Sequence, residues 1–150
     1  MKSKIKLLKF TIRDISEKYI SWLKDPSIVR FTRIKETKIE QIISYVIKNT
    51  KSKNVIFLKI LLNKNHIGNV RLFTKKKTIS IAIIIGEKKY HGIGIGTEVI
   101  KKLVKKIKKM KKMKKIESFI NKLNYPSIAI FEKNSFVKDN IVFGKWTLNI

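Results

Sequence analysis

The sequence contains no cysteine and only two prolines and six glycines in 150 residues. The absence of cysteine excludes disulfides, thiolate metal sites and a cysteine nucleophile, and it is compatible with a reducing cytoplasm. Because few residues interrupt regular structure, we expect one domain over residues 1–150 and no long linker. Long apolar runs are also missing: the longest, residues 81–85, or 79–85 if Ser80 is allowed, is far shorter than the roughly 20 residues that span a bilayer. We therefore expect a cytoplasmic protein without a membrane span.

Acidic residues are scarce as well, with 10 Asp and Glu against 36 Lys and Arg, and the net charge is +26. Such a charge suits nucleic acid, an anionic membrane or a polyphosphate ligand. Codon usage in an AT-rich genome explains much of the lysine, but it would also favour glutamate. Arginines are few and no aromatic residues alternate with the lysines between Lys101 and Lys115, so nucleic acid is not expected as the main partner. A solvated basic surface is the favoured interpretation. Polyanion binding by the helix expected to carry Lys101 to Lys115 is the non-enzymatic alternative.

Hydrophobic periodicity predicts a mixed α/β domain whose sheet is not doubly wound. The expected strands are residues 5–10, 55–62, 66–73, 78–85 and 115–120, and a final pair, 136–142 and 143–150. The expected helices run from Asp14 or Ser16 to Lys24, from a capping box at residues 37–40 to Asn49, along the lysine-rich segment after Gly96, and over residues 127–134. The nearly continuous isoleucine of residues 78–85 predicts a strand buried on both faces.

A glycine-rich loop, with Gly92, Gly94 and Gly96, lies between that strand and the long helix. Glycines let the backbone approach a phosphate closely, and the first amides of a helix point at such a ligand. The P-loop pattern is excluded because Thr97 and Glu98 follow Gly96 where Lys and Ser/Thr would be required. The alternating spacing and the short remaining chain also exclude a dinucleotide fold. A tight turn that packs the helix onto the strand is the alternative interpretation.

Three segments together resemble the GNAT superfamily of acetyltransferases. Residues 90–98 resemble its acetyl-CoA loop, Gln/Arg-x-x-Gly-x-Gly/Ala, with His91 in the place of Gln or Arg. Residues 124–136 resemble its Asn-x-x-Ser-Ile-x-x-Phe-Glu-Lys-x-Gly-Phe segment, with Ser135 in place of the glycine. Residues 19–26 are similar to the opening of RimJ/RimL-type members, which include ribosomal-protein N-terminal and nucleotide-sugar N-acetyltransferases.

The resemblance implies a mixed, mostly antiparallel sheet of about seven strands with four helices, splayed between the fourth and fifth strands. It implies transfer of an acetyl group from acetyl-CoA to a primary amine, by direct attack in a ternary complex. The expected acceptor is an amino sugar on a nucleotide carrier, and a protein N-terminus is the alternative. A monomer or homodimer without a metal is expected.

The resemblance also implies roles for individual residues in holding acetyl-CoA. Ile83 and Ile85 would pair with pantetheine and offer an amide to the thioester oxygen, and Asn124 would bond the pantetheine arm or the leaving sulfur. The residues expected around the pyrophosphate are His91, Gly92, Ile93, Gly94, Ile95, Gly96 and Thr97.

Proton transfer is less well marked, because Phe131 stands where many relatives have a tyrosine and Ser80 where a carboxylate is frequent. The candidate replacements are Ser127 and Tyr125 for the acid, and Glu87, His66 and His91 for the base. We expect Asn124, Ser127 and Glu87 to be the catalytic residues, although Ser127 would also suit a helix N-cap. The acceptor is expected to contact Trp22, Arg30 and Phe31, of which Trp22 and Phe31 also suit a hydrophobic core.

Overall fold

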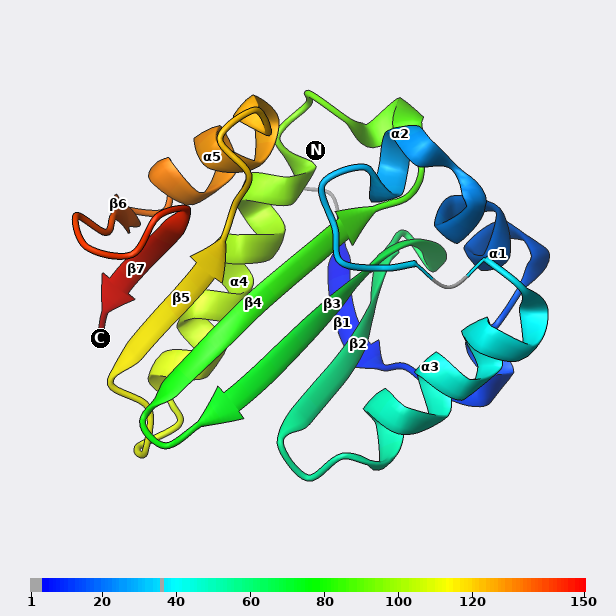
Figure 1. The fold of residues 1–150 in the computed structure, drawn as a ribbon, viewed down its shortest axis with the longest axis horizontal. Helices are drawn as coiled ribbons and strands as arrows, with labels where there is room; N and C mark the ends of the chain where they lie inside the picture. The colour runs from blue at the N-terminus through cyan, green and yellow to red at the C-terminus, as the bar shows by residue number, and fades with distance from the viewer. Residues whose placement is uncertain (1–3, 36) are drawn as a thin grey trace. The chain divides into compact units, whose positions relative to one another are not determined.

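Seven strands form one sheet in the order β1-β2-β3-β4-β5-β7-β6 in the computed structural model, which describes residues 4–35 and 37–150 (Figure 1). The strands are β1 Ile5–Lys9, β2 Val55–Leu62, β3 Asn65–Lys75, β4 Thr78–Ile85, β5 Lys115–Phe119, β6 Val137–Lys138 and β7 Lys145–Asn149. β1 with β2, β5 with β7 and β6 with β7 pair antiparallel, whereas β4 and β5 pair in parallel. The predicted mixed, mostly antiparallel sheet is therefore confirmed.

Five α-helices and two short 3-10 turns accompany this sheet in the described residues. They are η1 Ile12–Asp14, α1 Glu17–Lys24, α2 Pro26–Val29, α3 Ile39–Lys51, η2 Lys88–Tyr90, α4 Ile95–Lys108 and α5 Tyr125–Glu132. The four predicted helices are present as α1, α3, α4 and α5. Helix α2 was not predicted: it is a single turn in which Asp25 is the N-cap and Pro26 occupies the first turn, where proline is tolerated.

The chain forms two compact units, and β3 and β4 contribute residues to both. Unit 1 contains the chain up to Arg71 together with Ile83–Lys88. Unit 2 contains Leu72–Ala82 and Lys89–Ile150. The single domain expected over residues 1–150 stays a prediction.

Two helix starts differ from the predicted caps. The box expected at residues 37–40 lies one residue later, because Gln41 Oε1 accepts from the Lys38 amide at 3.2 Å and Lys38 is the N-cap of α3. Helix α5 begins before Ser127, since Asn124 Oδ1 accepts from the Ser127 amide at 3.3 Å. The N-cap interpretation of Ser127 is therefore wrong, whereas Ser16 caps α1 as predicted.

Two strand predictions are also wrong. Strand β4 is not buried on both faces: Ile79 and Ile81 are buried, but Ala82 is exposed and Ile83 to Ile85 are half-buried. Strand β6 has only two residues instead of the seven predicted for 136–142. The side chain of Asp139 turns the chain there, because Oδ1 accepts from the amides of Ile141 and Val142, both at 2.8 Å.

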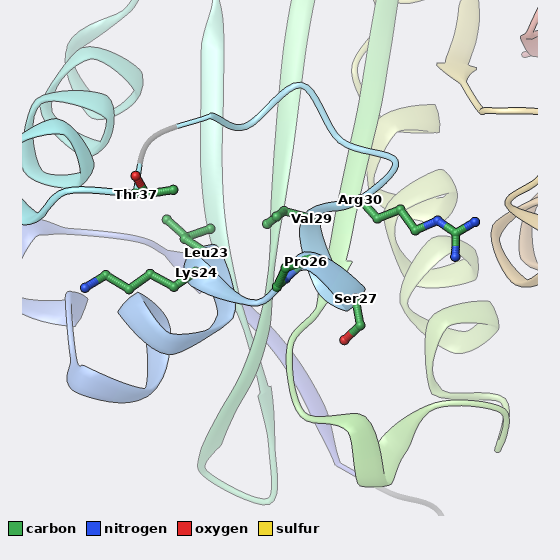
Figure 2. A pocket seen from close by; sticks show the side chains of 7 residues that line it. All are labelled: Leu23, Lys24, Pro26, Ser27, Val29, Arg30 and Thr37. Carbon is green, nitrogen blue, oxygen red and sulfur yellow. The ribbon is translucent and has the colours of Figure 1, made fainter.

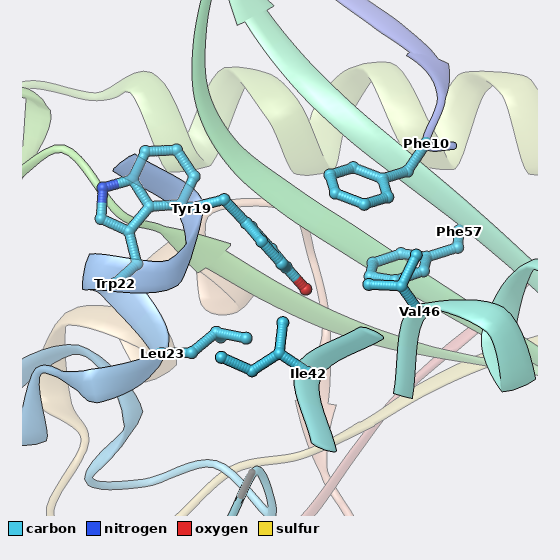
Figure 3. Close-up of a cluster of buried hydrophobic side chains, with 7 residues drawn as sticks. All are labelled: Phe10, Tyr19, Trp22, Leu23, Ile42, Val46 and Phe57. Atoms are coloured by element: carbon cyan, nitrogen blue, oxygen red, sulfur yellow. The ribbon is translucent and has the colours of Figure 1, made fainter. Parts of the chain in front are cut away.

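The core of unit 1 is aromatic and lies where α1 and α3 meet the sheet (Figure 3). The Phe10 ring is central, with ring centroids 4.9 Å from Tyr19 and 5.0 Å from Phe57. Burial of these rings contributes about 1.5–3 kcal/mol each. The cluster consists of Phe10, Tyr19, Trp22, Leu23, Ile42, Val46 and Phe57.

The core of unit 2 is mainly isoleucine and leucine and holds α4 in place. The buried face of α4 consists of Ile95, Gly96, Val99, Ile100, Leu103, Val104 and Ile107. Phe131 of α5 is 1% exposed and meets Phe136 edge-to-face, with ring centroids 4.9 Å apart. Phe131, which stands where relatives have a tyrosine, is thus a core residue.

Candidate functional site

The glycine loop has the backbone geometry that a phosphate requires. Gly92 and Gly94 adopt positive φ of 71° and 89°, a region that residues with a Cβ rarely enter. A Cβ built on either glycine would meet no atom within 4 Å, so the space beside both is open. Gly94 is the N-cap of α4, and the first bond of the helix runs from the Glu98 amide to the Gly94 carbonyl at 3.1 Å. The amides of Ile95, Gly96 and Thr97 precede that bond and lack a partner within the helix.

The third glycine has a different purpose from the first two. Gly96 is buried inside the first turn of α4, and a Cβ there would lie 2.5 Å from Cδ1 of Ile130 on α5. Its missing side chain lets α4 and α5 pack closely. Gly96 is therefore a packing residue, but against helix α5 and not against the strand of the alternative interpretation, whereas Gly92 and Gly94 face open space.

Asn134 ties the end of α5 to the start of α4. Its Nδ2 donates to the Thr97 carbonyl at 3.2 Å and to the Ile130 carbonyl at 2.9 Å. Sequence reasoning did not single this residue out, although it lies in the Asn124 segment that supported the resemblance. It holds the first turn of α4, whose amides lack a partner within the helix.

Asn124 and Ser127 lie together at the start of α5. Asn124 Oδ1 is occupied by the Ser127 amide, so the Nδ2 group is the part of this side chain that remains for a ligand. Both residues are half-buried, whereas Tyr125 between them is 68% exposed. The start of α5 therefore offers an amide donor and a hydroxyl within one helical turn.

A half-buried carboxylate that was not predicted from the sequence, Glu117, lies beside Ser80. Ser80 Oγ donates to Oε1 of Glu117 at 2.9 Å, and Lys145 Nζ lies 3.1 Å from Oε2. β4 and β5 pair in register at these positions, which brings Ser80 and Glu117 side by side. Because Glu117 is on a different strand from Ser80, spacing along the chain gave no signal for it.

β4 pairs with β5 from Thr78 to Ser80, against Lys115 to Glu117, although β4 continues to Ile85. Ser118 Oγ continues the contact by donating to the Ile81 carbonyl at 2.8 Å. Ile83 and Ile85, the residues expected along pantetheine, belong to the half-buried end of β4. The predicted splay between the two strands stays a prediction.

The residues just after β4 are anchored within unit 1. The Gly86 amide donates to the Ile67 carbonyl at 2.8 Å, and the Trp22 ring covers Gly86 so closely that a Cβ would lie 2.0 Å from Cδ2. Glu87 pairs loosely with Lys18 at 3.8 Å. Trp22 is 5% exposed and is a core residue, which was the alternative interpretation for this predicted acceptor contact.

Asp25 ties the next residue of that segment to α2. Lys88 Nζ lies 2.9 Å from Asp25 Oδ2, and Ser27 donates to Oδ1 from its amide at 2.9 Å and its hydroxyl at 2.7 Å. The bond from Lys88, followed by those from Ser27, lowers the pKa of Asp25 to about 2. Asp25 therefore stays ionised at neutral pH as the cap of α2.

His66, a candidate base, is a structural residue. Its Nε2 lies 3.0 Å from both the Gly68 carbonyl and Asn69 Oδ1, two acceptors, so this nitrogen carries the proton. Its ring packs among Phe10, Tyr19 and Trp22, with centroids 5.0–6.3 Å away. Burial lowers the pKa of His66, more than the bonds to Asn69 and Gly68 raise it.

We expect the free energy of unfolding to decrease as the pH falls below about 6.5, the ordinary pKa of histidine. Below that pH the histidine of the unfolded chain is protonated, whereas folded His66, whose pKa is lowered, binds its proton only at a lower pH. Among the charged neighbours of the ring, Lys18 lowers this pKa and Asp14 raises it. The slope from this residue is at most about 1.4 kcal/mol per pH unit. Urea unfolding at pH 5.0, 6.0 and 7.5 measures it. The variant His66→Gln keeps a donor and should flatten the curve; an unchanged slope in the variant would contradict this account.

An open hollow of about 580 Å³ lies on unit 1 beside α1 and α2. Figure 2 shows Leu23 and Val29 turned toward Thr37, while Lys24 and Arg30 extend outward on opposite sides. Of the three predicted acceptor contacts, Arg30 lines this hollow. Its guanidinium carbon lies 4.5 Å from the centre of the Phe31 ring, which is half-buried.

Within residues 4–35 and 37–150, no group of three or more His, Asp and Glu side chains could hold a metal. Across the same residues the longest helix, α4, has 14 residues, and none has both the length and the apolar character to cross a membrane.

The model of the acetyltransferase (GNAT) domain family matches residues 4–137. A domain from Methanocaldococcus jannaschii is 26% identical, with a TM-score of 0.84 over 99% of this chain and 100% of that one. The aminoglycoside acetyltransferase AAC(6')-Ib in complex with coenzyme A is 17% identical, with a TM-score of 0.86 over 97% and 95% of the two chains. A GNAT-family acetyltransferase from Bacillus anthracis is 18% identical, with a TM-score of 0.81 over 99% and 96%. No curated protein matches the chain.

The glycine loop at the start of α4, the parallel β4–β5 pair and the family match together define the class of protein. The chain belongs to the GNAT acetyltransferases. It is accordingly an acyl-CoA N-acyltransferase whose co-substrate is acetyl-CoA.

Proposed function

We propose that this enzyme acetylates a primary amine on an amino sugar carried by a nucleotide, by direct attack of the amine on acetyl-CoA in a ternary complex. The observation that carries the acetyl-CoA part is the pair of open, left-handed glycines at the N-terminus of α4. An anionic pyrophosphate fits there, because unpartnered amides and the positive end of the helix dipole face the same space.

The backbone would hold the pyrophosphate in this arrangement. The amides from Ile93 to Thr97 donate to phosphate oxygens, and Gly92 and Gly94 leave room for the ligand to approach. His91, exposed at the start of the loop, is the side chain closest in sequence to add a contact. Gly96 contributes its amide, and its missing side chain lets α4 pack against Ile130 of α5.

The reaction forms one C–N bond and breaks one C–S bond. The amine nitrogen attacks the thioester carbon, the carbonyl oxygen becomes an oxyanion, and the thiolate leaves as the nitrogen loses a proton. An amide at Ile83 or Ile85 would stabilise the oxyanion, and one such donor typically contributes about 3–4 kcal/mol. Asn124, with Oδ1 already occupied, would use Nδ2 to bond the pantetheine arm or the leaving sulfur.

Glu87 and Ser127 are proposed for proton transfer. Glu87 is a carboxylate whose ion pair with Lys18 is long, at 3.8 Å. The backbone amide of Ser127 donates to Asn124 Oδ1, which holds the backbone of Ser127 in place. Its hydroxyl is proposed to protonate the leaving thiolate. A general acid or base contributes roughly 10²–10⁴-fold to the rate, so loss of either residue would slow the enzyme without abolishing turnover.

The amino-sugar acceptor is supported by charge and by one relative. Arg30 is exposed on unit 1 and lies over the Phe31 ring, which presents a cation beside an aromatic face for a nucleotide diphosphate. AAC(6')-Ib, which shares the fold, has been solved with coenzyme A and kanamycin. Acetylation of a protein N-terminus is the alternative, because residues 19–26 resemble RimJ/RimL-type members, and we assign the chain to that branch as part of the proposal.

Calorimetric titration with acetyl-CoA at moderate salt tests the first part of this proposal. Saturable binding in the micromolar range is expected, and its absence would refute the role of the loop.

Thiol release with a panel of nucleotide-linked amino sugars, aminoglycosides and N-terminal peptides then tests the acceptor. Turnover should be fastest with a nucleotide-linked amino sugar, and it should fall at least tenfold in Arg30→Gln, mainly through KM. Preference for a peptide would favour the alternative acceptor.

A further inference from the structure

Lysines are concentrated on one surface of unit 2, far above their share in the rest of the chain. Between Lys101 and Lys114, nine of 14 residues are lysine and the other five are Leu, Val, Ile or Met. Three more lysines form the tip of the β3–β4 hairpin. We call the whole set the lysine face: Lys75, Lys76, Lys77, Lys101, Lys102, Lys105, Lys106, Lys108, Lys109, Lys111, Lys112 and Lys114.

Two segments distant in sequence make up this surface. The Lys114 amide donates to the Lys77 carbonyl at 2.8 Å, which places the hairpin tip against the turn that follows α4. The same two connections lie side by side in Figure 1, where the turn after α4 meets the tip between β3 and β4. The turn is also held from within, because the Met110 amide donates to the Ile107 carbonyl at 2.8 Å. The lysines therefore stand on a fixed backbone.

No ion pair joins the lysine face to an acidic residue among the residues that the structure describes. All members of the face are exposed, and the lysines found in ion pairs, Lys18, Lys59, Lys88 and Lys145, lie outside it. Like charges three and four residues apart, such as Lys101 and Lys105, repel each other and destabilise the helix. An anionic partner would remove that repulsion.

Codon bias does not explain the high lysine content of α4, because another helix of the same chain contains few lysines. Helix α3 is of similar length and also amphipathic, yet only two of its seven polar residues are lysine. In α4 every polar position after Glu98 is lysine. Codon bias acts on both helices alike, so it does not account for the larger share of lysine among the polar residues of α4.

We propose that the lysine face binds the phosphate backbone of a nucleic-acid duplex, independently of sequence, as a second function beside acetyl transfer. From Lys101 to Lys108 the helix rises about 10 Å. A duplex carries one charge per about 1.7 Å of axis, so roughly six phosphates lie alongside that stretch. Lysine contacts phosphate as a point charge, and the absence of arginine from this face leaves no bidentate reader of base edges.

Two observations favour a duplex over other polyanions. The apolar side of α4 is buried in the core of unit 2, so the helix has no free apolar face to insert into a membrane. No aromatic residue lies between Lys101 and Lys114, so single-stranded bases have nothing on which to stack. The phosphates of a regular duplex need neither an apolar face nor stacking.

Fluorescence anisotropy with a labelled 20-base-pair DNA duplex tests the proposal on the full chain. The quadruple variant Lys101→Gln, Lys105→Gln, Lys108→Gln and Lys112→Gln removes four charges along α4 and the following turn. The matched control Lys4→Gln, Lys6→Gln, Lys53→Gln and Lys64→Gln removes four exposed charges from unit 1. Each lost phosphate contact should reduce the slope of log K against log salt by about 0.9 and weaken binding about eightfold at 0.1 M salt.

We expect roughly 50-fold weaker duplex binding in the α4 variant, from two or more lost contacts, and less than threefold in the control. Circular dichroism should show both variants folded. Equal weakening in the two variants would mean that only net charge matters and would overturn the proposal. Tighter binding to a single strand of equal charge, or to anionic phospholipid vesicles at a salt concentration that abolishes duplex binding, would overturn the choice of partner.

Discussion

Replacing Gly94 with alanine is expected to weaken acetyl-CoA binding by roughly 100-fold or more while the chain stays folded. Gly94 has a φ of 89°, and a Cβ there would project into the open space at the start of α4, where the first amides lack a partner within the helix. The methyl group would keep a phosphate from at least two of those amides. Hydrogen bonds to a charged group contribute about 1.5–3 kcal/mol each, and two such losses correspond to roughly 100-fold in Kd. Calorimetric titration of the variant with acetyl-CoA measures the effect.

Gly144→Ala is the matched control for that experiment. Gly144 has a φ of 77°, so alanine strains the backbone by a similar 1–2 kcal/mol, and a Cβ there would meet its nearest atom at an ordinary 3.4 Å. It lies in the connection to β7 and not in the loop that begins α4. Thermal unfolding should shift comparably in the two variants, whereas acetyl-CoA affinity should fall only in Gly94→Ala. An equal loss of affinity in both would show that strain, and not the ligand's space, is responsible.

Gly86→Ala is expected to destabilise the protein by about 3 kcal/mol or more, one of the largest effects of any single methyl group in this chain. The added Cβ would lie 2.0–2.4 Å from three atoms of the Trp22 indole, which is held in a buried aromatic cluster and cannot rotate away. Overpacking of this kind typically costs 1–3 kcal/mol, and here the obstacle is a rigid ring. Urea unfolding gives the free energy directly.

A double-mutant cycle with Trp22→Leu separates this clash from a general backbone effect. Trp22→Leu alone should destabilise by leaving a cavity, but it removes the ring that Gly86→Ala strikes. The two changes should therefore be non-additive, with a coupling energy above about 1 kcal/mol. Strict additivity would exclude the indole as the cause.

Local pattern was sufficient for most of the secondary structure. The hydrophobic spacing in α3 and α4 and the polar turns between β2, β3 and β4 are short-range signals, and these elements formed where they were expected. The one-turn helix α2 and the two-residue β6 depend on single side-chain bonds, from Asp25 and Asp139, that periodicity does not report. The burial of β4 was overestimated because a run of isoleucine indicates which residues are apolar, not which neighbours cover them.

The candidate site shows the same limit. The loop around Gly92 and Gly94 was visible in the sequence because the backbone itself requires glycine there. The partnership of Ser80 with Glu117 and Lys145 joins three strands, so no spacing along one segment could reveal it. Gly86 was likewise not singled out, since its requirement comes from the Trp22 ring more than 60 residues earlier.

The two hydrogen bonds of Asn134 couple local opening of α5 to local opening of the first turn of α4. Its side-chain amide donates to the carbonyls of both Thr97 and Ile130, so one side chain connects the first turn of α4 to the last turn of α5. A local opening that frees α5 also loosens the turn on which a pyrophosphate would rest. The first hydrogen-bonded amides of α4, beginning with Glu98, should therefore exchange with deuterium in step with those of α5, as one cooperative unit, and not with the lysine-bearing turns farther along the same helix.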